Sequence, residues 1–381
     1  MPIYLDCNAT TPMEPAVAAI VRRFMETDFG NPASPIHDFG VFARAAVDHA
    51  RKQIARVVDA RPDEVIFTSG ATESNNLAIL GLIAEGERSG RRHLMTTAIE
   101  HKAVLEPFEV MARLGFEVEI VPVGPDGRFD PERIAAGLRP DTLLVSTMQV
   151  NNETGVLQPL AELGAILAGH DAWWHVDAAQ GFGKDLASLG QGRMDLISLS
   201  GHKIHGPKGI GALIARKRGP SLPPLRPLMY GGGQEQGLRA GTLPVPLIAG
   251  LGEAAKLALR HHGERREKCL AIRAQAINAL TALGARQNGD ERHTLPHALN
   301  VSLPGIESDR AIAALKDVIA VSSTSACTSH TRTPSHVLLA MGCSPERVET
   351  SLRFSWCHLT DAVDWDRVTS ILSGLRGSKG A

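Results

Sequence analysis

Short apolar runs alternate with longer amphipathic runs from about residue 64 to residue 260, and this alternation limits the possible folds more than any other feature. Strands are predicted for the short runs, and helices for segments between them such as Glu73–Glu85 and Leu160–Ala168. Such alternation is typical of a mostly parallel sheet with helices on both faces, an α/β fold. The predicted strands are Glu64–Thr68, His93–Thr97, Glu117–Pro122, Thr142–Thr147, Trp173–Asp177, Leu196–Leu199 and Gly211–Ala215.

A second, smaller α+β domain is predicted beyond this alternating region, because 381 residues exceed what one hydrophobic core usually holds. The helix-like run Pro246–Leu283 is long enough to bridge two lobes, which puts the boundary near residue 255. The large domain is then 15–255, and the small domain combines 1–14 with 256–381. The small domain contains a predicted strand (Ala298–Leu303), a helix (Ser308–Lys316), a Ser/Thr-rich loop (Ser322–Thr333) and two further short helices.

Composition and charge exclude several classes of protein. Hydrophobic residues make up 43% and charged residues 21% of the chain, and the formal net charge is −1. These are ordinary globular values, and the charge gives no reason to expect direct binding to nucleic acid or to an acidic membrane. The N-terminus lacks the pattern of a signal peptide, and no apolar run reaches the roughly 18–20 residues needed to cross a bilayer.

The five cysteines are odd in number, widely spaced and without a C-x-x-C pair. A disulfide framework is therefore unexpected, and the spacing indicates no cysteine zinc site. A reducing cytoplasm fits this usage best. The cysteines are Cys7, Cys269, Cys327, Cys343 and Cys357.

The segment Thr68–Asn76, TSGATESNN, follows a predicted strand and opens a predicted helix. Its small residues allow close approach of an oxyanion, the helix N-terminus offers free N–H groups, and Thr72 adds a hydroxyl. The alternative is an ordinary cap formed by Ser69 or Thr72, with Glu73 in the first turn. The segment lacks the G-x-x-x-x-G-K-[ST] pattern, which disfavours binding of a nucleoside triphosphate.

Asp177 ends a predicted strand and Lys203 follows another, at the sheet edge where ligands of such folds gather. A protonated pyridine nitrogen would satisfy a buried Asp177 carboxylate, although that residue could equally cap a following helix. Lys203 lies between Ser200 and His202, both of which can donate to a phosphate, and its amine could form a Schiff base. A solvated lysine in a flexible glycine-rich loop would look similar.

Cys327 lies among small hydroxylated residues in the segment SSTSACTS. A thiol on such a loop can be reached by substrate, whereas most free cysteines are buried and inert, as expected for Cys269 in its amphipathic helix. A phosphate cradle, a ring-nitrogen carboxylate, a Schiff-base lysine and a mobile thiol together indicate pyridoxal 5'-phosphate acting beside a nucleophilic cysteine.

The order of these motifs resembles that of cysteine desulfurases of the IscS/NifS type, from about residue 4 to residue 356. The resemblance implies a fold-type-I pyridoxal-phosphate enzyme of the class V aminotransferase group, working as a homodimer. The motifs that carry it are TSGATESNN, IEHKAV, VNNETG, HVDAAQ, SGHKIHGPKGIG, GGGQEQGLRAGT and SSTSACTS.

Roles at the cofactor ring follow from the resemblance. Lys203 is the implied Schiff-base lysine and the base that takes the substrate's α-proton. Asp177 is implied to pair with the pyridine nitrogen and Gln180 to contact the ring hydroxyl. His101 is implied to stack on the ring and assist proton transfer; without the resemblance it would be interpreted as a helix-start histidine.

The resemblance also implies a phosphate site and a substrate site. Thr242 would reach the phosphate from the other subunit. Asn152 and Arg353 would clamp the substrate carboxylate, which an arginine can bind in bidentate fashion, although a surface ion pair is the alternative for Arg353. The phosphate-binding residues within the chain would be Ala71, Thr72, Ser200 and His202.

The implied activity converts L-cysteine to L-alanine, with the sulfur held as a persulfide on Cys327 and passed to a sulfur-acceptor protein. Iron–sulfur assembly, tRNA thiolation and DNA phosphorothioation all begin with this type of enzyme, and the whole chain resembles the phosphorothioation desulfurase. A selenocysteine lyase would share the cofactor machinery. A scaffold that kept the fold and lost catalysis is the third alternative.

Some positions depart from the family pattern. Pro35 replaces an expected Arg or Ser, which should stiffen its loop, and Thr324 stands where Gly is common, which should restrict the start of the Cys327 loop. Trp356 and Cys357 follow the strand that carries Arg353, where they leave the local packing open to question.

Overall fold

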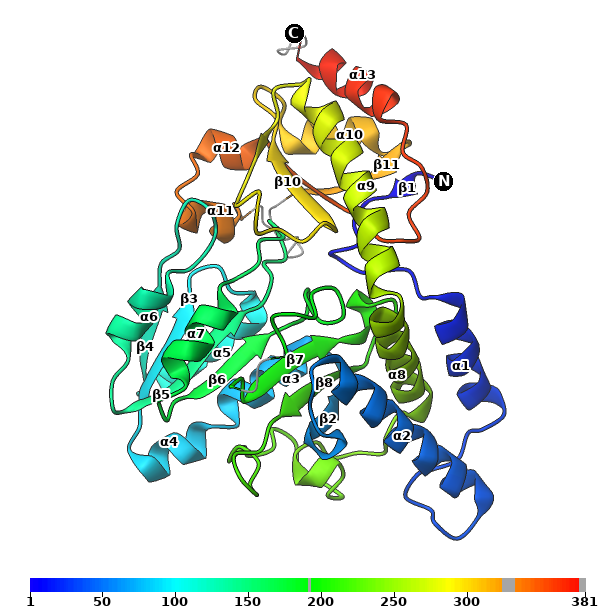
Figure 1. The fold of residues 1–381 in the computed structure, drawn as a ribbon, viewed down its shortest axis with the longest axis vertical. Coiled ribbons are helices and arrows are strands. Elements are labelled where there is room, and N and C mark those ends of the chain that lie inside the picture. Colours follow the sequence, from blue (N-terminus) through cyan, green and yellow to red (C-terminus); the bar gives the residue numbers. More distant parts are fainter. Residues whose placement is uncertain (191–192, 324–332, 377–381) are drawn as a thin grey trace.

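A computed structural model describes residues 1–190, 193–323 and 333–376 of the chain, and Figure 1 shows its two groups of strands. The larger group is a 7-stranded sheet with the order β2-β8-β7-β6-β5-β3-β4. The strands β7, β6, β5, β3 and β4 run parallel, and β8 is antiparallel to both β7 and β2. This confirms the α/β fold class and all the predicted strands of the large sheet. They are β2 (Val65–Thr68), β3 (His93–Thr97), β4 (Glu117–Val121), β5 (Thr142–Met148), β6 (Trp173–Asp177), β7 (Leu196–Ser200) and β8 (Gly211–Ala215).

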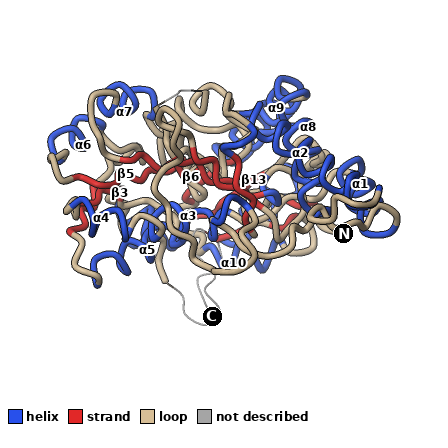
Figure 2. Tube along the Cα trace, turned by 90° about the horizontal axis from the view of Figure 1, so that it is seen from below, coloured by secondary structure: helices blue, strands red, loops and turns tan. Residues whose placement is uncertain are grey.

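Helices cover both faces of this sheet, and Figure 2 shows α6 and α7 on the opposite side from α4 and α5. Successive strand residues point to opposite faces, so Trp174 joins one buried cluster and its neighbour Trp173 joins the other. Apolar side chains on both faces explain why the strands appear in the sequence as short continuous apolar runs. The helices are α1 (Pro15–Glu26), α2 (Asp38–Val57), α3 (Ala71–Leu80), α4 (Ile83–Ser89), α5 (Lys102–Arg113), α6 (Pro131–Gly137), α7 (Leu160–Leu167) and α8 (Val245–Arg260).

A second sheet, with the order β12-β13-β10-β9, has a core of its own that includes Leu5 from the N-terminal segment. That segment reaches this core because β1 (Ile3–Tyr4) pairs in parallel with β11 (Ile319–Ala320). The division into 15–255 and 1–14 with 256–381 stays a prediction. The other elements are α9 (His262–Thr281), β9 (Arg286–Gln287), β10 (Ala298–Ser302), α10 (Ser308–Leu315), β12 (Ser322–Ser323), α11 (His336–Ala340), α12 (Pro345–Glu349), β13 (Ser351–Ser355) and α13 (Trp365–Leu375).

The prediction of one continuous helix over Pro246–Leu283 is wrong. The chain leaves helical geometry at His261, where φ is −105° and ψ is 17°, so α8 ends and α9 begins there. The break lets α8 pack with α1 and α2 on the large sheet while α9 joins the core of the small sheet. The change of direction is visible in Figure 1.

Two smaller boundaries also differ. The predicted helix Glu73–Glu85 is two helices, because the chain turns at Gly81, where a side chain would come within 2.3 Å of the Leu77 carbonyl oxygen. The predicted loop Ser322–Thr333 begins as a strand, since Ser322 and Ser323 pair with β13. Cys327 and Thr324 lie outside the described residues. Among the described helices, none combines the length and the apolar character of a membrane span.

Candidate active site

Lys203 lies where the sheet, the N-terminal segment and the second sheet meet. It ends a short 3-10 turn, Gly201–Lys203, directly after β7. Its Nζ donates hydrogen bonds to the backbone carbonyl oxygens of Asn8 and of Ala9, the latter at 3.0 Å. Burial, with the positive charges of Lys184 and Arg353, lowers the pKa of Lys203 to about 7. A lysine with so low a pKa supplies a neutral, nucleophilic amine near neutral pH.

Asp177 ends β6 and is 6% exposed. Its Oδ2 accepts a hydrogen bond from Asn75 Nδ2 at 2.7 Å and its Oδ1 accepts one from the Ala179 backbone N–H at 2.9 Å. Each oxygen keeps further lone pairs, so the carboxylate can accept an additional cationic N–H. The interpretation of Asp177 as the cap of a following helix is wrong, because residues 179–184 form turns and not a helix.

Gln180 contacts the same backbone carbonyl as Lys203. Its Nε2 donates to the carbonyl oxygen of Asn8 at 2.8 Å. Its Oε1 is buried without a hydrogen-bond partner. A buried acceptor without a partner is costly, and a ligand hydroxyl would satisfy it. The residues around Lys203 therefore fit a cofactor that carries a protonated ring nitrogen and a ring hydroxyl.

His101 begins α5, and its Nδ1 accepts a hydrogen bond from the Ala103 backbone N–H at 3.0 Å. The helix-start interpretation is therefore correct, and it is compatible with a role in the site because the cap uses Nδ1 and not Nε2. Burial lowers the pKa of His101, the carboxylate of Asp177 opposes this shift, and the cation of Lys203 adds to it. His101 is thus close enough to both groups to respond to their charges.

The segment proposed as a phosphate cradle forms the first turn of α3. Gly70 is the N-cap and no side chain caps the helix, so the interpretation that Ser69 or Thr72 provides the cap is wrong. The first N–H groups of the helix, including that of Ala71, are therefore left for a ligand. Ser200 lies against Gly70, because a Cβ on Gly70 would be 3.5 Å from its Oγ.

His202 and Thr72 differ in burial: the ring of His202 is partly buried, whereas Thr72, in this first turn, is exposed. His202 Nδ1 is 3.1 Å from Thr10 Oγ1, and burial with nearby Lys203 lowers its pKa to about 4. The ring is therefore neutral and can donate a single hydrogen bond. Thr72 is exposed and lines a cavity of about 680 Å³ that also has Glu153 and His336 on its wall.

Arg353 is on β13 and is only 9% exposed, so the surface ion pair considered for it is wrong. One terminal nitrogen, Nη2, bonds Asp6 Oδ1 at 2.8 Å, and Nη1 donates to the Asn152 backbone carbonyl oxygen at 3.1 Å. Its Nε is buried without a partner. The guanidinium therefore keeps donors for a carboxylate. In the register of β12 and β13, Ser322 is paired with Arg353.

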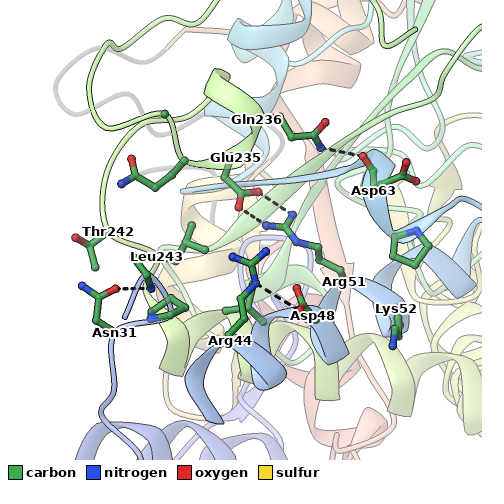
Figure 3. A pocket seen from close by; sticks show the side chains of 16 residues that line it. Asn31, Arg44, Asp48, Arg51, Lys52, Asp63, Glu235, Gln236, Thr242 and Leu243 are labelled. Atoms are coloured by element: carbon green, nitrogen blue, oxygen red, sulfur yellow. Dashed lines mark hydrogen bonds and ion pairs between the residues drawn. The ribbon is translucent and has the colours of Figure 1, made fainter. Parts of the chain in front are cut away.

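Thr242 lies apart from these residues within one chain. Figure 3 shows it at a pocket of about 630 Å³ together with Arg44, Arg51 and Glu235. Glu235 anchors this loop, because its carboxylate binds Arg51 and accepts the Phe67 backbone N–H at 2.7 Å. A role for Thr242 in a partner's site stays a prediction, as does the role of Cys327.

Trp356 and Cys357, which depart from the family pattern after β13, are both buried, and Trp356 belongs to the core of the small sheet. Trp356 is fully buried, and its indole N–H lies 2.8 Å from the Pro296 carbonyl oxygen and 3.1 Å from that of Cys269. The indole therefore joins β13 to α9, which resolves the question about local packing. Pro35 is exposed on its loop.

Sequence analysis missed three residues of the site. Asn8 supplies the carbonyl that holds Lys203 and Gln180, Asp6 pairs with Arg353, and Asn75 pairs with Asp177. The polar run DCNATT within an otherwise apolar N-terminus was the available signal for the first two. Asn75 is 0% exposed inside TSGATESNN, yet a polar residue on a short helix has no sequence feature that predicts its burial.

Comparison with known proteins identifies the family. The family model for the class-V aminotransferases matches residues 3–368. This chain belongs to the class-V aminotransferase family. Within this family it groups with the cysteine desulfurases: it is 44% identical to cysteine desulfurase IscS of Dechloromonas aromatica over 98% of the chain and 91% of that protein.

Two solved structures of other proteins are also similar to this chain. The crystal structure of DndA from Streptomyces lividans is 51% identical, with a TM-score of 0.82 over 92% of this chain and 98% of DndA. The structure of SspA in complex with cysteine is 35% identical, with a TM-score of 0.81 over 93% of this chain and 98% of SspA. The expected resemblance to cysteine desulfurases and the expected fold are both confirmed.

Proposed function

We propose that this chain uses pyridoxal phosphate to convert L-cysteine to L-alanine and transfers the sulfur to its own Cys327. The observation that carries the proposal is the environment of the Lys203 amine. Burial lowers the pKa of this amine to about 7, and the charges of Asp177 and Arg353 also influence it. Class-V relatives named as cysteine desulfurases, and a related structure named as a complex with cysteine, support this choice of substrate.

Each group of the site has a task in this reaction. Asp177 and Gln180 would hold the ring, the first turn of α3 with Ser200 and His202 would bind the phosphate, and the bound cofactor would supply an electron sink. Lys203 would bind the cofactor covalently and, once released by substrate, move the proton at the substrate's α-carbon. His101 would assist that proton transfer. Arg353 and Asn152 would fix the substrate carboxylate.

Transfer of the sulfur from substrate to Cys327 needs no separate oxidant or reductant. The Cys327 thiolate attacks the substrate sulfur, an S–S bond forms, and the C–S bond breaks with its electron pair staying on the carbon skeleton. Protonation of that carbon gives L-alanine, and the enzyme keeps the sulfur as a persulfide. A sulfur-acceptor protein would then take it, and a homodimer would complete each site with Thr242 of the other subunit.

The destination of the sulfur is proposed to be DNA phosphorothioation rather than iron–sulfur assembly or tRNA thiolation. The 51% identity to DndA exceeds the 44% identity to the IscS relative, over nearly the whole chain in both cases. Capturing the acceptor that takes labelled sulfur from the persulfidated protein in a cell extract tests this. Capture of an iron–sulfur scaffold alone would overturn this choice of acceptor and leave the activity untouched.

The activity itself is tested with two variants of the holoprotein. Borohydride should fix the cofactor on Lys203, and Lys203→Ala should abolish both this label and alanine formation. Cys327→Ala should keep the label and lose sulfur transfer, whereas Cys343→Ser serves as the cysteine control. Full activity of Cys327→Ala on L-selenocysteine but none on L-cysteine would confirm the thiol's role in sulfur transfer; full activity on L-cysteine would exclude Cys327 as the acceptor. A protein that binds no cofactor would be the inactive scaffold.

A further inference from the structure

Two histidines and a cysteine form a cluster next to the 3-10 turn that ends at Lys203. None of the three is assigned a role in the proposed sulfur reaction. His205, Cys357 and His358 each bring one ligand atom to within 4.8 Å of the others. His205 follows the 3-10 turn of Lys203, and the other two follow β13. His205 and Cys357 are 5% and 3% exposed, while His358 is partly buried. The cluster therefore joins segments that are far apart in the sequence.

Both histidines are oriented by partners on their other ring nitrogen. His205 Nδ1 lies 3.1 Å from the Pro12 carbonyl oxygen, and His358 Nε2 lies 2.6 Å from Glu14 Oε1. Histidines that bind metals make these contacts, to a carbonyl or to a carboxylate, and the contacts fix the ring orientation. These contacts do not use Nε2 of His205 or Nδ1 of His358, so both atoms remain for a ligand.

The sulfur of Cys357 is the third donor of the cluster. The backbone N–H of Cys357 donates to Thr360 Oγ1 at 3.0 Å, and that hydroxyl lies 3.8 Å from the Cys357 sulfur. These contacts hold the turn that follows β13. Thiolate sulfur is a donor that zinc accepts in proteins.

A small cavity adjoins the cluster, and one of the histidines that line it has a buried ring nitrogen without a partner. It measures about 20 Å³ and is lined by His205, His358 and His297 among others. That volume admits one water or one small ion. His297 is 8% exposed, and its Nδ1 is buried without a hydrogen-bond partner. An unsatisfied, buried imidazole nitrogen beside two oriented imidazoles is independent evidence for a ligand at this place.

Charged side chains surround the cluster. Glu14 places a carboxylate at the outer side of His358, and Arg265 shares this carboxylate through a 2.6 Å ion pair. Lys184 also lines the cavity. A Cys357 thiolate and the Glu14 carboxylate would offset the two charges of a bound dication, and Arg265 adds one positive charge beside them.

We propose that His205, Cys357 and His358 bind one zinc ion, with a water molecule in the cavity as the fourth ligand. Imidazole nitrogen and thiolate are the donors that zinc prefers in proteins, and three protein ligands with one water is an established coordination. Binding releases the thiol proton of Cys357. This site goes beyond the proposed desulfurase activity and does not depend on it. Its bound ion would tie the Lys203 turn to the strand of Arg353.

The test measures zinc in the holoprotein, with Cys327→Ala in every variant so that the proposed acceptor thiol cannot bind metal. After chelator treatment, incubation with zinc chloride and desalting, mass spectrometry of the metal should find about one zinc per chain. Cys357→Ser and His358→Gln should lose it, and Glu14→Gln, which removes the carboxylate that orients His358 and pairs with Arg265, should weaken zinc binding about 10–100-fold. Cys343→Ser and His293→Gln are matched controls and should bind as the parent does.

Spectroscopy keeps the proposal falsifiable if a variant fails to fold. Zinc-edge X-ray absorption of the parent should show two nitrogen ligands, one sulfur and one oxygen. Cobalt(II) in place of zinc should give the long-wavelength bands of a tetrahedral site in the parent and not in His358→Gln. Absence of retained zinc, equal zinc in parent and His358→Gln, or a metal environment without sulfur would each overturn the proposal.

Discussion

Arg353 and Asp6 form a buried ion pair with 2.8 Å between Nη2 and Oδ1, which joins the second sheet to the N-terminal segment. The pair uses one of the five N–H donors of the guanidinium, and the Asn152 carbonyl oxygen takes another. The planar group is thereby fixed in orientation while Nε stays without a partner. An arginine in this state is prepared to bind a second carboxylate.

The first prediction concerns Arg353→Lys. Lysine keeps the charge and loses the planar fork, so the substrate carboxylate would lose at least one charged hydrogen bond, worth about 1.5–3 kcal/mol. We expect the KM for L-cysteine to rise about 10–100-fold, with a smaller change in kcat. Steady-state alanine formation measures both constants. The exposed Arg367→Lys is the control, and an unchanged KM in Arg353→Lys would exclude the carboxylate clamp.

Thr242 should act on the site of the partner subunit. In a heterodimer of one Lys203→Ala chain and one Thr242→Ala chain, one site keeps both its own Lys203 and the partner's Thr242. That heterodimer should show about half the wild-type activity, because one of two sites is intact. A heterodimer of wild type with the double variant should show less, since its one Lys203 site lacks Thr242. Equal activities of the two purified heterodimers would contradict action across the dimer.

Asn75→Ala should disturb Asp177 without touching the cofactor directly. The substitution removes the 2.7 Å hydrogen bond to Asp177 Oδ2 in a fully buried place. We expect stability to fall by about 1–3 kcal/mol. We also expect the pH at which the bound cofactor's absorbance band titrates to shift, which a purely structural role would not cause. Asn76→Ala, whose side chain donates to the Thr72 backbone carbonyl oxygen, is the matched control and should change neither quantity.

Glu100 should make stability depend on pH. Complete burial raises its pKa to about 8, so the folded protein keeps a proton that the unfolded chain releases near its ordinary pKa of 4.5. The folded state therefore binds more protons between these values, and stability falls as the pH rises from about 4.5 to 8. Glutamine at position 100 has no titrating proton, so this fall in stability should be absent in Glu100→Gln.

Urea unfolding at pH 5.5 and pH 8.5 checks this. Relative to wild type, Glu100→Gln should gain about 3 kcal/mol between the two pH values. The exposed Glu87→Gln should show no such difference. A wild-type protein whose stability rises over this range faster than that of Glu100→Gln would contradict the predicted sign.

The strands and the site were predictable to different degrees for physical reasons. Strands such as His93–Thr97 and Trp173–Asp177 were predicted with their observed bounds, because full burial on both faces gives short apolar runs with clear ends. The break at His261 was not predicted, since charged residues on either side favour helix and only packing against two different sheets requires the change of direction.

Lys203 and Asp177 were found because each lies at or just after the end of a strand that could be recognised. Asn8 could not be found in this way, because its partners Lys203 and Gln180 are more than 170 residues away and the contact is made by a backbone carbonyl. The same applies to His205 and Cys357, whose separation in the sequence hides their proximity. Local patterns report on helices and strands, whereas contacts between distant segments depend on the complete fold.

The carbonyl oxygen of Asn8 makes the N-terminal segment part of the candidate active site through its backbone. We expect an affinity tag or a truncation near that segment to displace the residues that hold the amine of Lys203, whereas α13 packs into the small core. Protein engineered for assays should therefore carry its tag at the carboxyl terminus, and altered cofactor spectra after N-terminal tagging would have a mechanical origin.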